Sequence, residues 1–402
     1  MAVVIPPIVS VDDHVIEPPD LWERWLPEKF RSRGPRVVRA PYEMVREKQP
    51  FRRAASGPET DFWIYEDLAA GVQLVMACAG IDDGEEVTLG PISFDGMRPG
   101  CYDVKARLAD MDLNHVERSL CFPTFPRFCG QTFLEAADKD LAVACVRAYN
   151  DWTVEEWAGE SGGRLVPLCL VPLWDPVAAG EEVRRNAARG ARAVAFSELP
   201  QALGLPSLHD AERRWDPFLA ACDDTGTVIC LHIGSSSTFL FSAADAPGAA
   251  GYSLTALNSM MSMTDWLLSG VLVRFPNVRI AFSESQVGWM PYHIQRIDDV
   301  WKQHHKREVG GVSHIAEPPS TYVAGRVFGC IVQDDFGIAL RGGILGIDQI
   351  TFESDYPHTD STWPHTLQYA EHALADYSQE EADKVIRTNA IALFGLPEEL
   401  PA

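Results

Sequence analysis

The sequence predicts an α/β fold in which eight parallel strands and their helices close into a (β/α)8, or TIM, barrel. Eight short apolar or β-rich runs alternate with stretches of helical periodicity, and eight is the number of strands that closes such a barrel. Residues that can bind a metal or transfer a proton stand at the ends of several runs. Their side chains can meet only if the strands are parallel, with their carboxyl ends at one rim.

Each predicted strand is a short run rich in apolar residues, as expected for the buried strands of a parallel sheet. In chain order the predicted strands are 8–11, 118–122, 166–171, 191–196, 228–231, 278–282, 327–332 and 349–352. The predicted helices lie between and after them, at 134–159, 177–189, 210–224, 253–273, 288–306, 334–345, 366–376 and 379–394.

Residues 17–100 interrupt this alternation, because they are rich in Pro, Gly, Arg and Trp and contain only short periodic pieces. We expect most of this segment to be a lid inserted after the first strand, with residues 62–65 packed over the barrel mouth and Trp63 in contact with substrate. The chain has no internal repeat and no low-complexity linker, so we expect residues 1–402 to form a single domain.

The composition is that of a soluble enzyme, with 46% hydrophobic and 23% charged residues. A net charge of -23 disfavours nucleic acid and anionic membranes as partners. The start of the chain lacks the features of a signal peptide, and nine scattered cysteines without CxxC spacing indicate buried free thiols in a reducing cytoplasm. We expect a cytoplasmic homodimer or higher homo-oligomer that acts on a small molecule.

The strongest functional signal lies at the end of the first strand. Side chains alternate along a strand, so Asp12 and His14 would project from one side while Asp13 points away. His232 ends the fifth predicted strand, and Asp355 follows the eighth. A strand-end Asp or His is, by itself, more often a loop cap or a hydrogen-bonding residue, but four of them in this order favour a metal site. Mixed imidazole and carboxylate ligands suit Zn²⁺ first, with Mn²⁺ and Fe²⁺ as alternatives.

Four sequence blocks resemble the amidohydrolase superfamily. They are Asp12-x-His14-x-x-Glu17, His232 at the fifth strand, Phe275-Pro-Asn-Val-Arg-Ile with Gly288-Trp-Met-Pro-Tyr292, and Ser354-Asp-Tyr-Pro-His358. More narrowly, the chain resembles the branch related to 2-amino-3-carboxymuconate-6-semialdehyde decarboxylase, which includes dihydroxybenzoate and carboxyvanillate decarboxylases as well as hydrolases. The resemblance covers nearly the whole chain apart from the lid, and it implies a barrel enzyme.

The resemblance implies that Asp12, His14, His232 and Asp355 hold one divalent metal ion. Other branches bridge two metals with a carbamylated lysine at the fourth strand. Residues 191–197 contain no Lys, which favours a site for a single ion. At the sixth strand, where relatives usually place a His, this chain has Glu284.

Further candidates lie near these strand ends. Glu284 and His358 are candidates for proton transfer, and a buried Glu284 would have to be paired or protonated. Arg127 could bind a substrate carboxylate in bidentate fashion or pair with an acidic neighbour. Trp363 is expected at the rim as a substrate contact, with loop packing as the alternative for both Trp363 and His358. Glu17 is expected to support the site structurally.

Two enzymatic functions fit these residues. The first is non-oxidative decarboxylation of a small (hydroxy)carboxylic acid, with Asp355 as the proton donor. The second is hydrolysis of an amide, lactone or ester by metal-activated water, with Asp355 as base and Glu284 or His358 as acid. A third reading is a barrel that binds a metal or ligand without turnover. The resemblance favours the decarboxylase.

Overall fold

The computed structural model describes residues 3–45, 50–81, 88–307 and 309–400, and its centre is a parallel sheet. The strands lie in the order β7-β6-β1-β13-β12-β11-β10-β9-β8. Their bounds are β1 (Ile8–Val15), β6 (Val116–Pro123), β7 (Leu165–Val166), β8 (Leu168–Cys169), β9 (Ala193–Phe196), β10 (Val228–His232), β11 (Ile280–Ser283), β12 (Val327–Ile331) and β13 (Ile350–Phe352).

The two ends of this strand order are the halves of one interrupted strand. Only Pro167, which has no N–H to donate, separates β7 from β8. β7 pairs with β6, and β8 pairs with β9, so the chain itself joins the ends of the sheet. Counted as one strand, β7 and β8 give eight parallel strands in a ring, and the predicted barrel is confirmed.

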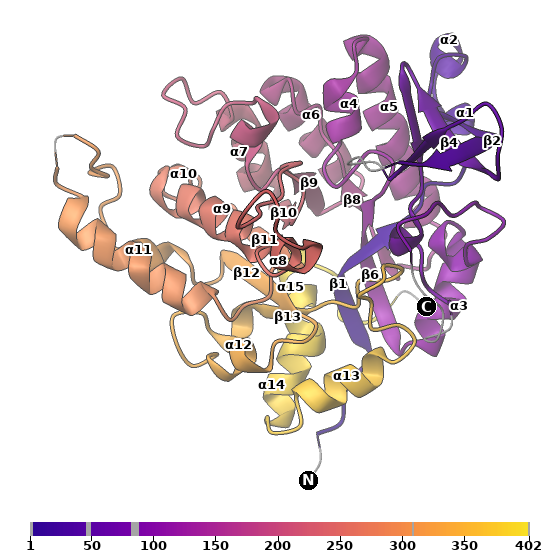
Figure 1. The fold of residues 1–402 in the computed structure, drawn as a ribbon. Helices are drawn as coiled ribbons and strands as arrows, with labels where there is room; N and C mark the ends of the chain where they lie inside the picture. Colours follow the sequence, from indigo (N-terminus) through magenta and orange to yellow (C-terminus); the bar gives the residue numbers. More distant parts are fainter. Residues whose placement is uncertain (1–2, 46–49, 82–87, 308, 401–402) are drawn as a thin grey trace.

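Helices surround these strands (Figure 1). The helices that match predicted ones are α5 (Lys139–Trp152), α6 (Pro176–Ala187), α7 (Asp216–Thr225), α9 (Ala256–Leu268), α11 (Met290–His304), α12 (Asp335–Ala339), α13 (Thr366–Ala373), α14 (Gln379–Asp383) and α15 (Asn389–Phe394). The remaining helices are α1 (Leu21–Trp25), α2 (Glu28–Arg31), α3 (Val104–Leu113), α4 (Gln131–Glu135), α8 (Gly248–Tyr252) and α10 (Val271–Arg274). The sequence did not predict α3, because its buried side chains include Arg107 and Asp110 and its apolar periodicity is weak.

The insertion after β1 contains a second sheet that the sequence did not predict. Its strands are β2 (Arg36–Met44), β3 (Phe51–Arg53), β4 (Glu59–Tyr65) and β5 (Leu68–Gly71), in the antiparallel order β3-β2-β4-β5. Alternation along β4 gives this sheet two faces. Phe62 packs in a small separate core, whereas Trp63 and Tyr65 join the main core. The Trp63 ring lies 4.9 Å from the ring of Phe125, in the loop at the carboxyl end of β6. The role of this sheet as a lid stays a prediction.

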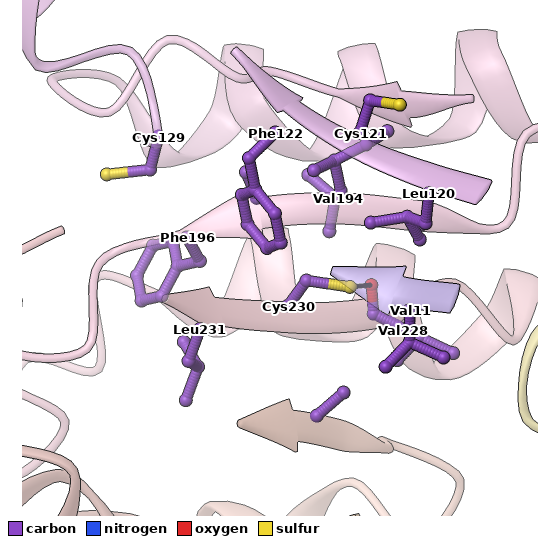
Figure 2. Close-up of a cluster of buried hydrophobic side chains, with 14 of the residues drawn as sticks. Val11, Leu120, Cys121, Phe122, Cys129, Val194, Phe196, Val228, Cys230 and Leu231 are labelled. Carbon is purple, nitrogen blue, oxygen red and sulfur yellow. Dashed lines mark hydrogen bonds between the residues drawn. The ribbon is translucent and has the colours of Figure 1, made fainter. Parts of the chain in front are cut away.

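The core beneath the carboxyl ends of the strands is apolar. Figure 2 shows Val11, Phe122, Phe196 and Cys230 from four different strands in one cluster of buried side chains. All nine cysteines are buried and free, as predicted. Within the described ranges, the helices are too short or too polar to cross a membrane.

Candidate metal centre

Six side chains from the carboxyl ends of four strands meet in one cluster at the barrel mouth. They are Asp12 and His14 on β1, His232 on β10, Glu284 after β11, and Asp355 and His358 after β13. These are the four metal ligands and the two proton-transfer candidates that the sequence predicted. All are buried except Glu284, which is partly exposed.

The distances place His14 at the middle of the cluster. Its Nε2 atom lies 3.2 Å from Nε2 of His232, 3.2 Å from Oδ1 of Asp355 and 3.6 Å from Oδ1 of Asp12. Nε2 of His232 lies 3.5 Å from Oδ2 of Asp12 and 3.6 Å from Oε2 of Glu284. Potential ligand atoms of Asp12, His14 and His232 therefore lie close enough together to share one ion.

The hydrogen-bonding pattern fits a bound cation. Both carboxylate oxygens of Asp12 and Oδ2 of Asp355 are buried without a hydrogen-bond donor. Unpaired buried carboxylates are costly and are normally paired or bound to a metal. Nδ1 of His232 lies 2.6 Å from the carbonyl oxygen of Ile233, so Nδ1 carries the proton and Nε2 offers its lone pair to the cluster.

The electrostatics of the imidazoles agree with this assignment. Burial lowers the pKa of His232 to about 3, and burial together with the charge of His358 lowers the pKa of His14 well below its usual range. Both rings are therefore neutral, which is the form that binds a metal. Burial opposes protonation of His358 as well, but the neighbouring Asp355 carboxylate and its hydrogen bond raise the pKa of His358 to about 10.

The carboxylates carry an excess of buried negative charge. Burial and the charges of Glu353 and Glu284 raise the pKa of Asp12 well above its usual range. Burial raises the pKa of Asp355 to about 6, and burial and the charge of Asp355 raise the pKa of Glu284. Of the imidazoles in the cluster, His358 alone is protonated, so the carboxylates outnumber it and favour a further compensating cation.

Glu353 is a part of this cluster that the sequence reasoning missed. Its Oε2 accepts hydrogen bonds from the backbone N–H of Glu284, at 3.1 Å, and from the thiol of Cys330. Burial raises its pKa to about 8. The available signal was an acidic residue directly after the apolar strand Ile350–Phe352. Glu284 and Asp355 both have a φ of 55°, a left-handed conformation that is costly for such residues and often marks functional sites.

Asp13 points away from the cluster, as the alternation predicted. Its carboxylate accepts hydrogen bonds from the hydroxyls of Ser119 and Ser354 and from the backbone N–H of Tyr356. Ser354 and Tyr356 flank Asp355, so Asp13 ties the loop that carries Asp355 to β1.

Aromatic rings from the end of β6 and the segment after it form one wall of the cluster, the candidate metal centre. The Phe128 ring stacks on His232 at 4.1 Å, and the Phe122 ring lies 4.8 Å from the same imidazole. Glu17 supports this wall, as expected, because its buried carboxylate accepts from the N–H groups of Thr124 and Phe125 at 3.0 and 2.8 Å.

A cavity of about 280 Å³ lies next to this wall and is lined in part by Phe128. It is lined by Trp63, Leu68, Ala70, Gly71, Val72, Gln73, Met76, Pro123, Thr124, Phe125, Arg127, Phe128, Thr132 and Glu135. Trp63 and Arg127 are thus placed beside the centre, where the sequence predicted substrate contacts.

The three predicted substrate contacts lie in different surroundings. Arg127 Nη2 lies 2.5 Å from Oε1 of Glu135, which is the acidic pairing considered from the sequence. Trp363 lies away from the cavity, where its indole N–H donates to the carbonyl of Asp110 at 3.3 Å and its ring lies under the guanidinium of Arg98. Substrate contact by Trp63, Arg127 and Trp363 stays a prediction.

Comparison with known proteins identifies the family. The sequence model of the amidohydrolase family matches residues 30–396. An amidohydrolase from Mycobacterium avium subsp. paratuberculosis K-10 superposes with a TM-score of 0.69 at 23% identity, over 98% of this chain and 100% of that one.

Two structures of decarboxylases share the same fold. The 2,6-dihydroxybenzoate decarboxylase from Rhizobium has a TM-score of 0.60 at 16% identity, over 97% of this chain and 99% of its own. The manganese-bound 5-carboxyvanillate decarboxylase from Novosphingobium aromaticivorans has a TM-score of 0.60 at 16% identity, over 74% of this chain and 82% of its own. The resemblance seen in the sequence blocks is confirmed, and this chain is a member of the amidohydrolase family.

Proposed function

We propose that this protein is a metal-dependent carboxy-lyase that removes CO2 without oxidation from a small (hydroxy)carboxylic acid. The observation that carries the proposal is the pair formed by Asp355 and His358 within the cluster. Oδ1 of Asp355 lies 3.0 Å from Nδ1 of His358, and burial raises the pKa of Asp355 to about 6. Asp355 can therefore accept a proton from His358 and pass it to the substrate.

The metal would be held by Asp12, His14, His232 and Asp355. When bound there, a divalent cation supplies Lewis-acid polarisation of a substrate oxygen. Zn²⁺ suits the two imidazoles, and the carboxylates favour harder ions such as Mn²⁺. Manganese is named with the Novosphingobium decarboxylase, so Mn²⁺ and Zn²⁺ are the two ions to test first.

Side chains of this protein carry out the proton transfer. Asp355 delivers a proton to the carbon that bears the substrate carboxylate. The bond between that carbon and the carboxylate carbon then breaks, its electron pair returns to the substrate carbon skeleton, and CO2 leaves. His358 returns a proton to Asp355 and is protonated again from water. One proton is taken up for each CO2 released.

Hydrolysis of an amide, lactone or ester is the second candidate, and the position of Glu284 favours it. Oε1 of Glu284 lies 3.7 Å from Nδ1 of His358. Hydrolysis needs a base for the attacking water and a separate acid for the leaving group. The cluster offers Asp355 for the first role and the Glu284–His358 pair for the second, whereas decarboxylation needs only one proton donor.

The test is a screen of hydroxybenzoates and lactones with enzyme loaded with Mn²⁺ or Zn²⁺, in which CO2 release and acid production are both measured. We expect CO2 release, and in D2O one deuterium at the carbon that carried the carboxylate. Asp355→Asn should abolish this activity, while Asp376→Asn, at an exposed carboxylate farther along the chain, should not change it. Acid production without CO2 would overturn the decarboxylase in favour of the hydrolase, and product without solvent deuterium would exclude Asp355 as its proton donor.

A further inference from the structure

The cavity beside the metal centre belongs to a different chemical environment from the centre itself. Within the described part of the chain, none of the six cluster residues lines it. Its walls come from β4, β5 and the segment that follows them on one side, and from residues 123–135 on the other. Three of its lining residues, Trp63, Phe125 and Phe128, are aromatic, and most of the others are apolar. We call this space the apolar chamber.

Phe128 borders both the apolar chamber and the candidate metal centre. Its ring stacks on the His232 imidazole with an interplanar angle of 13° and also lines the chamber. The loop after His232 presses against the same ring, because a Cβ atom on Gly234 would lie 3.0 Å from Cε2 of Phe128. A ligand that filled the chamber would therefore contact a residue that itself stacks on a predicted metal ligand.

The chamber offers no unpaired charge among the side chains that the structure places around it. Its charged lining residues are Arg127 and Glu135, and their ion pair at 2.5 Å leaves the wall neutral. Leu68 and Glu135 are exposed, which places the opening to solvent at their end. A neutral, largely apolar space gains free energy by taking up an uncharged apolar group and disfavours a second carboxylate.

We propose that the apolar chamber binds an uncharged aromatic or aliphatic part of the substrate, while the reacting carboxyl group reaches past Phe128 to the candidate metal centre. The substrate class is then a monocarboxylic acid with an apolar extension. That this group belongs to a substrate rests on the proposed function, whereas binding of an apolar group in the chamber does not.

A substitution at Ala70 tests this proposal. Ala70 on β5 is the register partner of Trp63 on β4, and both residues line the chamber. Ala70→Trp would therefore place a second indole within the space beside Trp63. Leu113→Trp is the matched control, because Leu113 is 67% exposed on α3 and lies outside the chamber.

The experiment measures binding of 1-naphthol, an uncharged bicyclic probe, to the metal-loaded enzyme by isothermal titration calorimetry. The parent and Leu113→Trp should bind it alike, and Ala70→Trp should bind it roughly tenfold or more weakly, a loss of about 1.4 kcal/mol. Ala70→Leu, which fills less of the space, should show an intermediate loss and guards against misfolding of the larger variant. Metal content and thermal unfolding of all variants show that the fold persists. Equal binding to the parent, Ala70→Leu and Ala70→Trp would overturn the proposal.

Kinetics then separate this inference from the proposed function. If CO2 release is found but kcat/KM does not depend on the apolar extension of the acid in the parent or in Ala70→Trp, the chamber assignment is wrong and the decarboxylase stands. If no acid releases CO2 but 1-naphthol binds and Ala70→Trp prevents it, the proposed function is wrong and the chamber remains a binding site.

Discussion

Neighbouring residues on β1 have opposite roles because a strand alternates its side chains. Asp12 and His14 face the metal centre, where Asp12 has no hydrogen-bond donor within the described residues. Asp13 faces the other way and accepts hydrogen bonds from Ser354 and Tyr356, on either side of Asp355. A shift of one residue in the register of β1 would exchange these roles. The geometry of the candidate metal centre therefore depends on the register of the barrel as much as on the residues themselves.

At the level of single ligands, His232→Ala and Asp355→Ala should each remove most of the bound metal and the activity. Each change removes an atom that would bind the metal, and the cluster has few other such atoms. Metal content by elemental analysis is the measurement, with His372→Ala as control, since His372 is 80% exposed. Asp13→Ala should leave the metal-binding atoms in place but lower the free energy of unfolding. The change leaves the Ser119 and Ser354 hydroxyls and the Tyr356 N–H without their hydrogen-bond acceptor. Full metal content in the His232 and Asp355 variants would rule out their assignment as ligands.

Glu284 is the partly exposed member of the cluster, and its role can be tested with a nearly isosteric change. If Glu284 takes part in proton transfer with His358, Glu284→Gln should preserve metal binding and lower turnover by roughly 10²- to 10⁴-fold. The pH profile of kcat should lose one limb, because the amide does not titrate. Glu284→His should retain part of the activity with a shifted pH optimum. Glu371→Gln, at an exposed position, is the control. A Glu284→Gln variant as active as the parent would make Glu284 structural.

At the scale of elements, a buried carboxylate joins the loops after β9 and β10 to helix α9. Glu198 Oε1 accepts hydrogen bonds from the Gly234 N–H at 3.0 Å, the Ser236 hydroxyl at 2.8 Å and the Asn258 amide at 3.3 Å. Glu198 Oε2 and Asn258 Oδ1 are both buried acceptors without a donor. The loop that contains Gly234 and Ser236 follows His232 directly. Glu198 therefore helps to position His232 through this loop, without contacting the cluster.

The buried carboxylate of Glu198 should make the free energy of unfolding depend on pH. Burial raises the pKa of Glu198 from 4.5 to about 7. The folded protein then binds this proton more tightly than the unfolded chain does, so the contribution to stability is complete below pH 4.5 and is lost as the pH rises through about 7. Glu198→Gln should remove this part of the slope and gain stability relative to the parent at pH 8, by on the order of 2 kcal/mol. Denaturant unfolding at pH 5 and pH 8 measures it, with the exposed Glu160→Gln as control. An identical pH slope in parent and Glu198→Gln would contradict this account.

The antiparallel sheet of the insertion contributes Trp63 to the apolar chamber. Trp63 is only 2% exposed and packs against Trp22 and Phe125, so replacement by Ala would cost roughly 3–5 kcal/mol of stability. Trp63→Phe is the sharper change. It should raise KM by roughly two- to tenfold, the value of one aromatic contact, and leave kcat nearly unchanged because Trp63 lies outside the metal cluster. Steady-state kinetics beside Trp25→Phe, a change in the same insertion away from the chamber, provide the measurement. A fall in kcat with constant KM would show that Trp63 does not act through substrate binding.

Over the whole molecule, the sequence predicted best what local periodicity encodes. The eight strands and the cluster of Asp12, His14, His232 and Asp355 followed from apolar runs and from the polar residues at their ends. Helix α3 could not be predicted, because it buries Arg107 and Asp110 against groups far away in the sequence. Arg107 donates to the carbonyl of His14, 93 residues away. The insertion sheet and the part played by Glu353 likewise depend on contacts between distant segments, which a pattern along one chain does not contain.

Removal of the metal should destabilise the whole protein, and more strongly at high pH than at low pH. Without a cation, the cluster must hold Asp12, Glu353 and Asp355 close together, and burial raises the pKa of Asp355 to about 6 and that of Glu353 to about 8. Because the folded state binds these protons more tightly than the unfolded chain, the apoprotein keeps this stability at low pH and loses it as the pH rises through about 6 and then about 8. The bound metal removes the need for these protons and adds about 2.7 kcal/mol when its free concentration is 100 times Kd.

The measurement is thermal unfolding of metal-loaded and exhaustively chelated protein at pH 5.5 and pH 8.5, with metal content determined for each sample. The difference in Tm between loaded and chelated protein should be small at pH 5.5 and several degrees larger at pH 8.5. His232→Ala should show little difference at either pH, because its site no longer holds the ion. A difference in Tm that is equal at both pH values would show that the buried carboxylates are not what the metal stabilises.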